Sequence, residues 1–150
     1  MNEHEYYMKL ALALAKDAQN DGDVPVGTVI VDADGFVIGR GRNRRKQSSS
    51  ATAHAEIEAI EEACKTLGDW RLDGCSLYVT LEPCPMCAGA VIMSRISRLY
   101  YGARDENTGS CGSVINLFME SYGQATRVTG GILADECGDM LTVFFKELRN

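Results

Sequence analysis

The sequence predicts an α/β protein built in layers. Short apolar or alternating segments typical of strands take turns with segments whose apolar residues recur at the 3.6-residue spacing of helices. This alternation favours a sheet covered by helices. At 150 residues the chain has the length of a common domain and can bury a hydrophobic core. No long linker, internal repeat or low-complexity run divides it, so we expect one domain over residues 1–150.

The individual elements follow from this periodicity and from the turn residues between them. Tyr7 and Leu14 belong to an apolar stripe on the first helix, and Leu141 and Phe144 to one on the last. The sequence Asp32-Ala33-Asp34-Gly35 is typical of a hairpin turn between two strands. In chain order we expect a helix over His4–Asn20, strands over Gly27–Asp32 and Phe36–Gly41, a helix over His54–Leu67, a strand over Ser76–Leu81, a helix over Met86–Ile96, strands over Arg98–Tyr101 and Gln124–Thr129, and a closing helix over Leu133–Arg149.

Two of these helices begin at residues that can carry chemistry. Thr52 is the expected N-cap of the helix over His54–Leu67, after an irregular stretch over Asn43–Thr52. Pro83 and Pro85 flank Cys84, and proline suits the first turn of a helix. Free N–H groups and the helix dipole favour anions at such positions, which lowers the pKa of a cysteine thiol placed there.

The segments His54-Ala55-Glu56 and Pro83-Cys84-Pro85-Met86-Cys87 predict a catalytic zinc site. One histidine and two cysteines supply three ligands, whereas a structural zinc site takes four from the protein. A catalytic site keeps the fourth position for water. We therefore expect one Zn²⁺ per chain, held by His54, Cys84 and Cys87, with Glu56 free to move protons.

Other interpretations of the same cysteines stay open at this point. A C-x-x-C pair also occurs as a redox pair, and cysteines often act as small buried hydrophobic residues. A structural zinc site would need a fourth ligand, and Cys111 and Cys137 are the candidates. The chain lacks the charged and apolar segments of a signal peptide, so we expect reduced thiols and a cytoplasmic protein. Its longest apolar run is too short to span a membrane.

Several segments resemble a known family. H-x-E followed by P-C-x-x-C is the signature of zinc-dependent nucleobase deaminases, and the surrounding residues resemble the cytidine-deaminase-like superfamily. Val24-Pro25-Val26-Gly27, Gly102-Ala103-Arg104-Asp105 and Gly131-Ile132-Leu133-Ala134-Asp135-Glu136-Cys137 are similar to the bacterial tRNA-specific adenosine deaminases. This resemblance runs from about residue 5 to 148 and implies a three-layer α/β/α fold with a mixed central sheet of about five strands.

The resemblance implies an activity as well. It is the conversion of adenosine to inosine at the wobble position of a tRNA anticodon, with water as co-substrate and Glu56 as the proton shuttle. It further implies a homodimer. The family pattern places substrate contacts at Asn43, Ala55, Asp105 and Phe145, the Ala55 contact through its backbone N–H. For Asn43 a left-handed turn residue is the alternative, and for Asp105 a solvated loop acid.

Two further residues have open roles at this stage. Glu82 stands two residues before Cys84, where it would either hydrogen-bond to a zinc ligand or cap the following helix. His4 has no apparent companion in the sequence, so we expect it at the surface.

Charge is unevenly distributed along the chain. The net charge is −6, whereas RNA-binding proteins usually present a basic surface. Five cations nevertheless occur within the seven residues 40–46, beside Asn43. The predicted RNA phosphate contacts in this run are Arg42, Arg44, Arg45 and Lys46, and the alternative is a solvated loop.

Two other functions remain to be distinguished. One is deamination of a free base or nucleoside of the guanine or cytosine type, which the same zinc chemistry would support. The other is a non-catalytic zinc subunit that only binds RNA. Such a subunit is expected to lack the proton-shuttling acid, so Glu56 argues against it.

Overall fold

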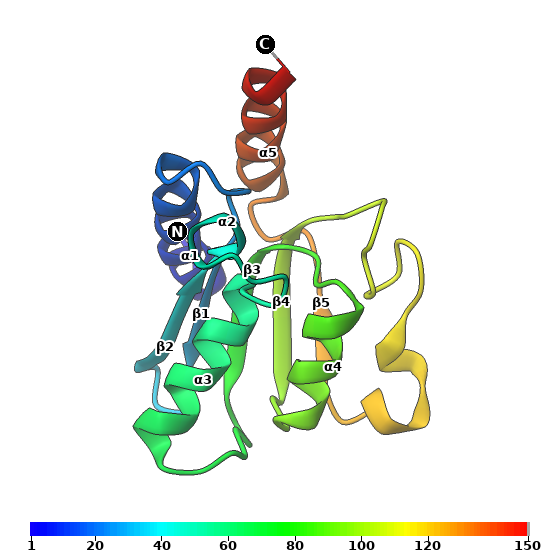
Figure 1. Cartoon of the computed structure of the whole chain (residues 1–150). Coiled ribbons are helices and arrows are strands. Elements are labelled where there is room, and N and C mark those ends of the chain that lie inside the picture. Colours follow the sequence, from blue (N-terminus) through cyan, green and yellow to red (C-terminus); the bar gives the residue numbers. More distant parts are fainter. Residues whose placement is uncertain (150) are drawn as a thin grey trace.

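The computed structural model, which describes residues 1–149, places helices on both faces of a five-stranded sheet (Figure 1). The helices are α1 (Glu3–Asn20), α2 (Arg45–Ser48), α3 (Ala55–Leu67), α4 (Pro85–Met93) and α5 (Ala134–Arg149), and the strands are β1 (Gly27–Val31), β2 (Val37–Arg42), β3 (Ser76–Leu81), β4 (Arg98–Ala103) and β5 (Arg127–Thr129). Two single 3₁₀ turns, Leu117–Met119 and Ser121–Gly123, precede β5.

The sheet is mixed, with the strand order β2-β1-β3-β4-β5. Strand β1 pairs antiparallel with both β2 and β3, whereas β3, β4 and β5 run parallel. The carboxyl ends of β3 and β4 therefore meet at one edge, where ligands bind in folds of this kind. The predicted three-layer fold with a mixed five-stranded sheet is confirmed.

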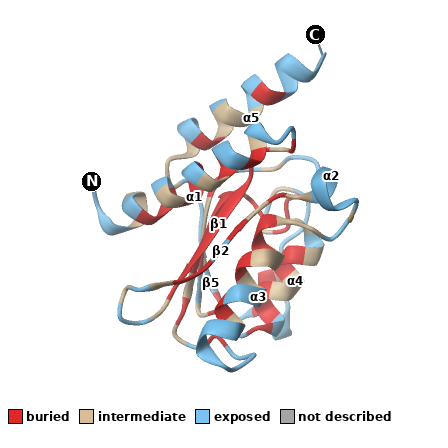
Figure 2. Cartoon of the chain, turned by 60° about the vertical axis from the view of Figure 1, so that its left-hand side comes forward, coloured by how far each residue is buried: buried red, intermediate tan, exposed pale blue. Residues whose placement is uncertain are grey.

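Each face of the sheet has its own hydrophobic core. Helices α3 and α4 pack on one face, where Ile30, Leu77 and Leu99 are fully buried. Helices α1 and α5 cover the other face, and Met8 of α1 is fully buried there. In Figure 2 the buried strands lie between these two layers of helices. The central strand β3 is thus covered on both sides, and four of its six residues are buried, as its apolar sequence requires.

Short side chains allow α3 to pack close to β2. A Cβ atom on Gly41 would fall on the backbone of Ala55, the first residue of α3. The absence of a side chain at Gly41 therefore fixes how near the start of α3 approaches the sheet. On the opposite face, α1 begins with a capping box in which Asn2 and Glu5 satisfy each other's backbone N–H groups.

Some expectations for the elements were wrong. The N-cap of α3 is His54 and not Thr52, and the His54 side chain makes no capping hydrogen bond to that helix. The stretch predicted to be irregular contains the short helix α2. The last strand is limited to Arg127–Thr129, because Gln124 follows the second 3₁₀ turn. Among the described residues no helix is both long and apolar enough to cross a membrane.

His4 is not an isolated surface residue. Its Nδ1 atom lies 2.7 Å from the hydroxyl of Tyr78, and its ring stacks on Tyr100 with 4.3 Å between centroids. Tyr78 and Tyr100 stack on each other in neighbouring strands. These contacts hold the start of α1 against the sheet. His4 and Tyr78 are more than seventy residues apart in the sequence, so periodicity could not predict the contact.

Candidate metal-dependent active site

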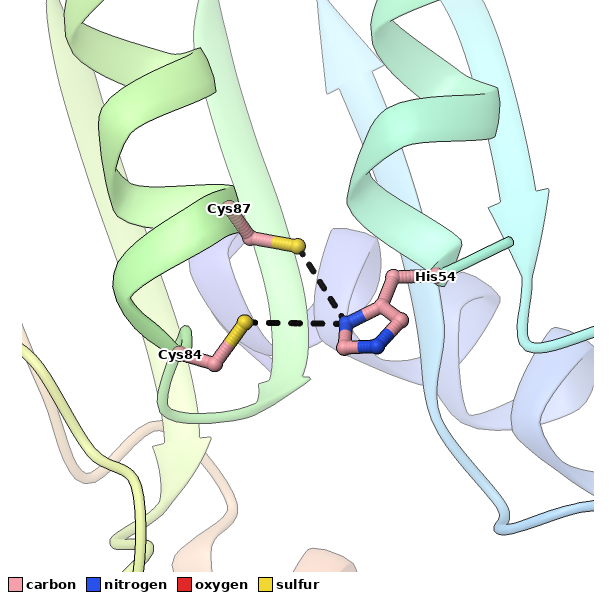
Figure 3. Close-up of side chains that lie close together, drawn as sticks. All are labelled: His54, Cys84 and Cys87. Carbon is pink, nitrogen blue, oxygen red and sulfur yellow. Dashed lines mark hydrogen bonds between the residues drawn. The ribbon is translucent and has the colours of Figure 1, made fainter. Parts of the chain in front are cut away.

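Three predicted zinc ligands come together where α3 and α4 begin (Figure 3). His54 is the N-cap residue of α3, and Cys84 is the N-cap residue of α4. Cys87 lies in the first turn of α4, where its side chain is fully buried. Pro83 and Cys84 directly follow Glu82 at the carboxyl end of β3, so the sheet sets the position of this turn.

The spacing of the three donor atoms fits a zinc ion. The Nδ1 atom of His54 lies 3.6 Å from the Cys84 sulfur and 3.5 Å from the Cys87 sulfur. In tetrahedral zinc, bonds of about 2.3 Å to sulfur and about 2.0 Å to nitrogen separate these atoms by roughly 3.6 Å. Neither Cys111 nor Cys137 joins the group within residues 1–149, so the donor set is the three-ligand set of a catalytic site.

The electrostatics of the group prepare the Cys84 thiol for metal. The pKa of the Cys84 thiol falls to about 4, chiefly because the Cys87 thiol donates a hydrogen bond to it and secondly because of His54, against the effect of burial. The same hydrogen bond, with burial, raises the pKa of Cys87. The pKa of His54 is raised by its hydrogen bond with Cys84. The hydrogen bonds within the group therefore favour the thiolate form of Cys84, and thiolate is the form that binds zinc.

Glu56 lies one residue into α3 beyond Ala55 and is only 4% exposed. Burial raises the pKa of its carboxyl group to about 7, with a smaller opposing effect from a backbone hydrogen bond. A group with a pKa near the working pH can both accept and donate a proton efficiently. Its position on the wall of the same cavity as His54 and Cys84 suits proton transfer beside the metal.

The ligands open into a cavity of about 560 Å³. That volume lies within the range of small-ligand pockets, roughly 300–1,000 Å³. Its lining residues are Val24, Val26, Asn43, Arg45, His54, Glu56, Leu81, Glu82, Cys84, Arg104, Asp105, Glu106, Asn107, Thr108, Leu141 and Phe145. The cavity is therefore drawn from segments spread along the whole chain.

Asn43 and Ala55 contact each other in this cavity. Asn43 is buried, lacks the left-handed backbone of a turn residue, and accepts the Ala55 N–H on its Oδ1 atom at 3.0 Å. The N–H that was expected to face the base is therefore donated to Asn43. The Nδ2 group of Asn43 has no hydrogen bond among the described residues and is left for another partner.

Glu82 neither caps α4 nor bonds to a zinc ligand. Its carboxylate is 2% exposed and accepts hydrogen bonds from the backbone N–H groups of Asp105, Cys111 and Ser113 and from the Ser113 hydroxyl. Burial alone would raise the pKa of this carboxyl group, but the Ser113 hydroxyl and the three N–H donors together hold it below its ordinary value. Glu82 is thus an ionised residue that organises a loop.

Asp105 also has a structural role within that loop. Its Oδ1 atom accepts the N–H groups of Asn107 and Thr108, and its Oδ2 atom accepts the Thr108 hydroxyl at 2.8 Å. The residue nevertheless lines the cavity and is only half buried. Both the loop contact and a substrate contact are compatible with this placement.

The predicted cation run divides into two parts. Arg42 pairs with Asp21 at 2.9 Å, and Arg44 pairs with Glu58 at 2.6 Å. Arg45 and Lys46 are exposed at the start of α2 and form no ion pair among residues 1–149. Arg45 lines the same cavity as His54 and Glu56, so this part of the run is close to the predicted zinc site.

Sequence reasoning missed some of the cavity wall. Val24 and Val26 were noted only as part of a family-like segment, and Leu141 only as part of an apolar helix face. Phe144 is buried, whereas Phe145 is 42% exposed and lines the cavity. The helical period explains why one of these neighbours is buried and the other exposed. Only the packing of α5 shows which of the two faces the cavity.

Comparison with known proteins agrees with this geometry. Residues 1–103 match the family model of the cytidine and deoxycytidylate deaminase zinc-binding region. The tRNA-specific adenosine deaminase of Bacillus subtilis (strain 168) is 49% identical over 150 residues, 99% of this chain and 92% of that protein. A solved structure from a study of A-to-I editing by tRNA:A34 deaminases at the wobble position superposes with a TM-score of 0.86 and 44% identity, covering 91% of this chain and 99% of that one.

A second kind of deaminase shares the fold. A guanine deaminase from Nitrosomonas europaea has a TM-score of 0.78 and 29% identity, with 93% of this chain and 83% of that chain covered. The matches together define the class, and the chain belongs to the zinc-binding cytidine and deoxycytidylate deaminase family. Within this family it groups with the tRNA-specific adenosine deaminases, which match it over nearly their whole length.

Proposed function

We propose that the protein hydrolyses adenosine to inosine at the wobble position of a tRNA anticodon. The single observation that carries the proposal is a cavity lined by buried Glu56 and by His54 and Cys84, two members of the His-Cys-Cys group that could hold zinc. The 49% identity to a tRNA-specific adenosine deaminase supports the choice of substrate. A base in an anticodon loop is already single-stranded, so little energy is needed to bring it into such a cavity.

His54, Cys84 and Cys87 would hold the zinc ion. When bound, zinc lowers the pKa of a coordinated water to about 7 and so supplies a nucleophile at neutral pH. The two sulfur ligands and the histidine come from the starts of two helices, so their relative positions are fixed before metal arrives. A preformed site reduces the cost of ordering ligands around the ion.

Glu56 would carry the protons of the reaction. Its carboxylate takes a proton from the attacking water and delivers it to N1 of the adenine ring. The oxygen of the water forms a bond to C6, and the bond from C6 to the exocyclic amino nitrogen breaks. The amino group leaves as ammonia after receiving the second water proton. The raised pKa of Glu56, about 7, suits a group that both accepts and donates in one turnover.

Other residues would position the RNA. The Nδ2 group of Asn43 faces no described partner and is available to a base or ribose acceptor. Asp105 and Phe145 line the same cavity, where Phe145 can pack against a nucleotide. Arg45 and Lys46, which form no ion pair within residues 1–149, are the proposed phosphate contacts, and Arg42 and Arg44 support them by shaping the loop.

We also propose a homodimer that acts in the cytoplasm, where tRNA is found. Met93 at the end of α4 is 72% exposed and Tyr122 is 64% exposed, which supports an interface over this region. None of the six cysteines forms a disulfide, in keeping with a reducing compartment. Sedimentation at micromolar concentration would give a species of twice the chain's 16.4 kDa mass.

Deamination of free guanine is the second candidate, because a guanine deaminase shares the fold. Ammonia release separates the two functions. We expect the zinc-loaded protein to release ammonia from an anticodon stem-loop with adenosine at the wobble position, and not from free guanine, cytosine or cytidine. Release from a free base at a rate equal to or above that from the RNA would reverse the assignment.

A further inference from the structure

The loop that follows β4 forms part of the cavity wall, and the buried side chain of Glu82 links this loop to the zinc-binding turn. Residues 104–108 line the cavity, and the loop continues to Ser113. Glu82 accepts the N–H of Asp105 at 3.1 Å on one carboxylate oxygen and the N–H groups of Cys111 and Ser113 at 2.8 and 3.2 Å on the other. Its carboxylate therefore holds both the beginning and the end of the loop.

Close packing reinforces these hydrogen bonds. A Cβ atom on Gly109 would fall on the carboxyl group of Glu82 and on the carbonyl oxygen of Asp105. The backbone of Gly109 thus lies directly against Glu82, and the loop can close around the carboxylate only because this residue has no side chain. The Ser113 hydroxyl, which accepts from Arg104 Nε at 3.1 Å, is left to donate to Glu82.

The other end of this connection is the zinc-binding turn. Glu82 is followed directly by Pro83 and Cys84, and the carbonyl of Pro83 accepts the Ser110 N–H at 2.9 Å. The backbone N–H of Glu82 donates to Ala103 in the neighbouring strand at 2.8 Å. The zinc-binding turn at Pro83–Cys84 and the 105–113 loop are therefore joined both by the Glu82 side chain and by a backbone hydrogen bond.

We propose that Glu82 is a positioning residue that keeps the 105–113 loop in register with the zinc-binding turn. This inference rests on the proposed function, since the loop is taken to contact the nucleotide. Displacement of the loop by about 1 Å would lower turnover on the order of 10²-fold, because the reacting base would no longer be held against the nucleophile. Zinc binding itself would be unaffected, because Glu82 contacts no ligand atom.

The substitution Glu82→Gln tests the proposal with little change in shape. An amide in place of the carboxylate has one acceptor and one N–H₂ group. Turned one way, its N–H₂ group faces the Asp105 N–H, and turned the other way it faces those of Cys111 and Ser113. Every orientation therefore brings donors against each other. Glu62→Gln is the matched control, because Glu62 is exposed and accepts only the N–H of Arg40 far from the cavity.

Hydrogen exchange, zinc content and kinetics are measured on the zinc-loaded full-length protein. In Glu82→Gln we expect amide exchange in peptides covering 105–113 to rise by about tenfold or more, with one zinc per chain retained. With the anticodon stem-loop, kcat should fall while the equilibrium affinity for the RNA changes far less. A merely structural defect would instead lower the active fraction, the zinc content and RNA binding together. Glu62→Gln should match wild type in every measurement.

Gly109→Ala keeps the proposal testable if Glu82→Gln fails to fold. It leaves the carboxylate intact and pushes the loop away from it, so the same rise in exchange and the same fall in kcat are expected. Wild-type exchange in both variants would overturn the proposal, as would loss of zinc with a protected loop. If wild-type protein shows no activity on RNA, the proposed function fails, whereas the exchange measurement still decides the role of Glu82.

Discussion

The side-chain oxygen of Asn43 accepts the backbone N–H of Ala55 at 3.0 Å, joining the loop after β2 to the first residue of α3. Ala55 stands between the proposed ligand His54 and the proposed proton shuttle Glu56. The bond therefore fixes the segment that supplies both groups. It also leaves the Nδ2 group of Asn43 without a hydrogen bond among the described residues, as the proposed contact to the substrate requires.

Two substitutions separate these roles of Asn43. Asn43→Ala removes the bond to Ala55 together with the Nδ2 donor, so we expect lower turnover and a loss of about 1–3 kcal/mol in unfolding free energy from the unsatisfied N–H. Asn43→Asp keeps an acceptor for Ala55 but no donor. It should retain most of the stability and still lose turnover. An active Asn43→Asp enzyme would show that Asn43 only anchors the loop.

Zinc content tests the ligand set. Cys87→Ala removes one of three protein ligands, and we expect metal bound to the purified protein to fall from one per chain to well below it. Cys111→Ala is the matched control, because Cys111 is a partly buried thiol outside the group and should leave zinc unchanged. Elemental analysis gives the result directly, and full zinc in Cys87→Ala would exclude Cys87 as a ligand.

The salt dependence of tRNA binding tests the cation run. Replacing Arg45 and Lys46 with Ala should weaken binding, and each lost phosphate contact should reduce the slope of log K against log salt by about 0.7–0.9. Arg44→Ala should reduce the slope less, since Arg44 is neutralised by Glu58 at 2.6 Å. Filter binding or fluorescence anisotropy over a range of salt measures both. Equal slopes for wild type and the Arg45/Lys46 double variant would make this run a solvated loop.

The stability of the protein should depend on pH through Glu82. The pKa of this carboxyl group is held below its ordinary value by the Ser113 hydroxyl and three backbone donors, against the effect of burial. Its contribution is therefore fully present above the unfolded pKa, near 4.3, and is lost as the pH falls through the lower folded value. The difference in unfolding free energy between wild type and Glu82→Gln should be largest at neutral pH and shrink in acid. Denaturant titrations at several pH values measure it, and a constant difference would contradict the role of the ionised carboxylate.

Much of the fold could be predicted because local signals agreed. Alternation, turn residues and apolar stripes located all five strands and the four long helices α1, α3, α4 and α5 to within a few residues. The zinc group was predicted because its ligands are encoded as two short segments at helix starts. The N-cap residue of α3 is His54 rather than Thr52, and the N–H of Ala55, the first residue of the helix, is donated to Asn43, a contact that is not local in sequence.

What remained hidden depends on tertiary contacts between charged or polar side chains. Nothing near Glu82 in the sequence indicates that its partners are Asp105, Cys111 and Ser113. Likewise, the run of cations gave no sign that Arg44 pairs with Glu58 whereas Arg45 pairs with no acid in the described part of the chain. Periodicity reports which face of an element is buried, but it does not report which side chain lies across from it.

The most direct measurement is the mapping of inosine in tRNA by mass spectrometry after incubation with zinc-loaded protein. We expect one inosine, at the wobble position, in the wild-type reaction. Glu56→Gln should keep its zinc and fold while losing at least the ~10²–10⁴-fold typical of a general acid–base group. Inosine formed by Glu56→Gln at the wild-type rate, or no inosine in tRNA from a wild-type protein that converts free guanine, would contradict the account.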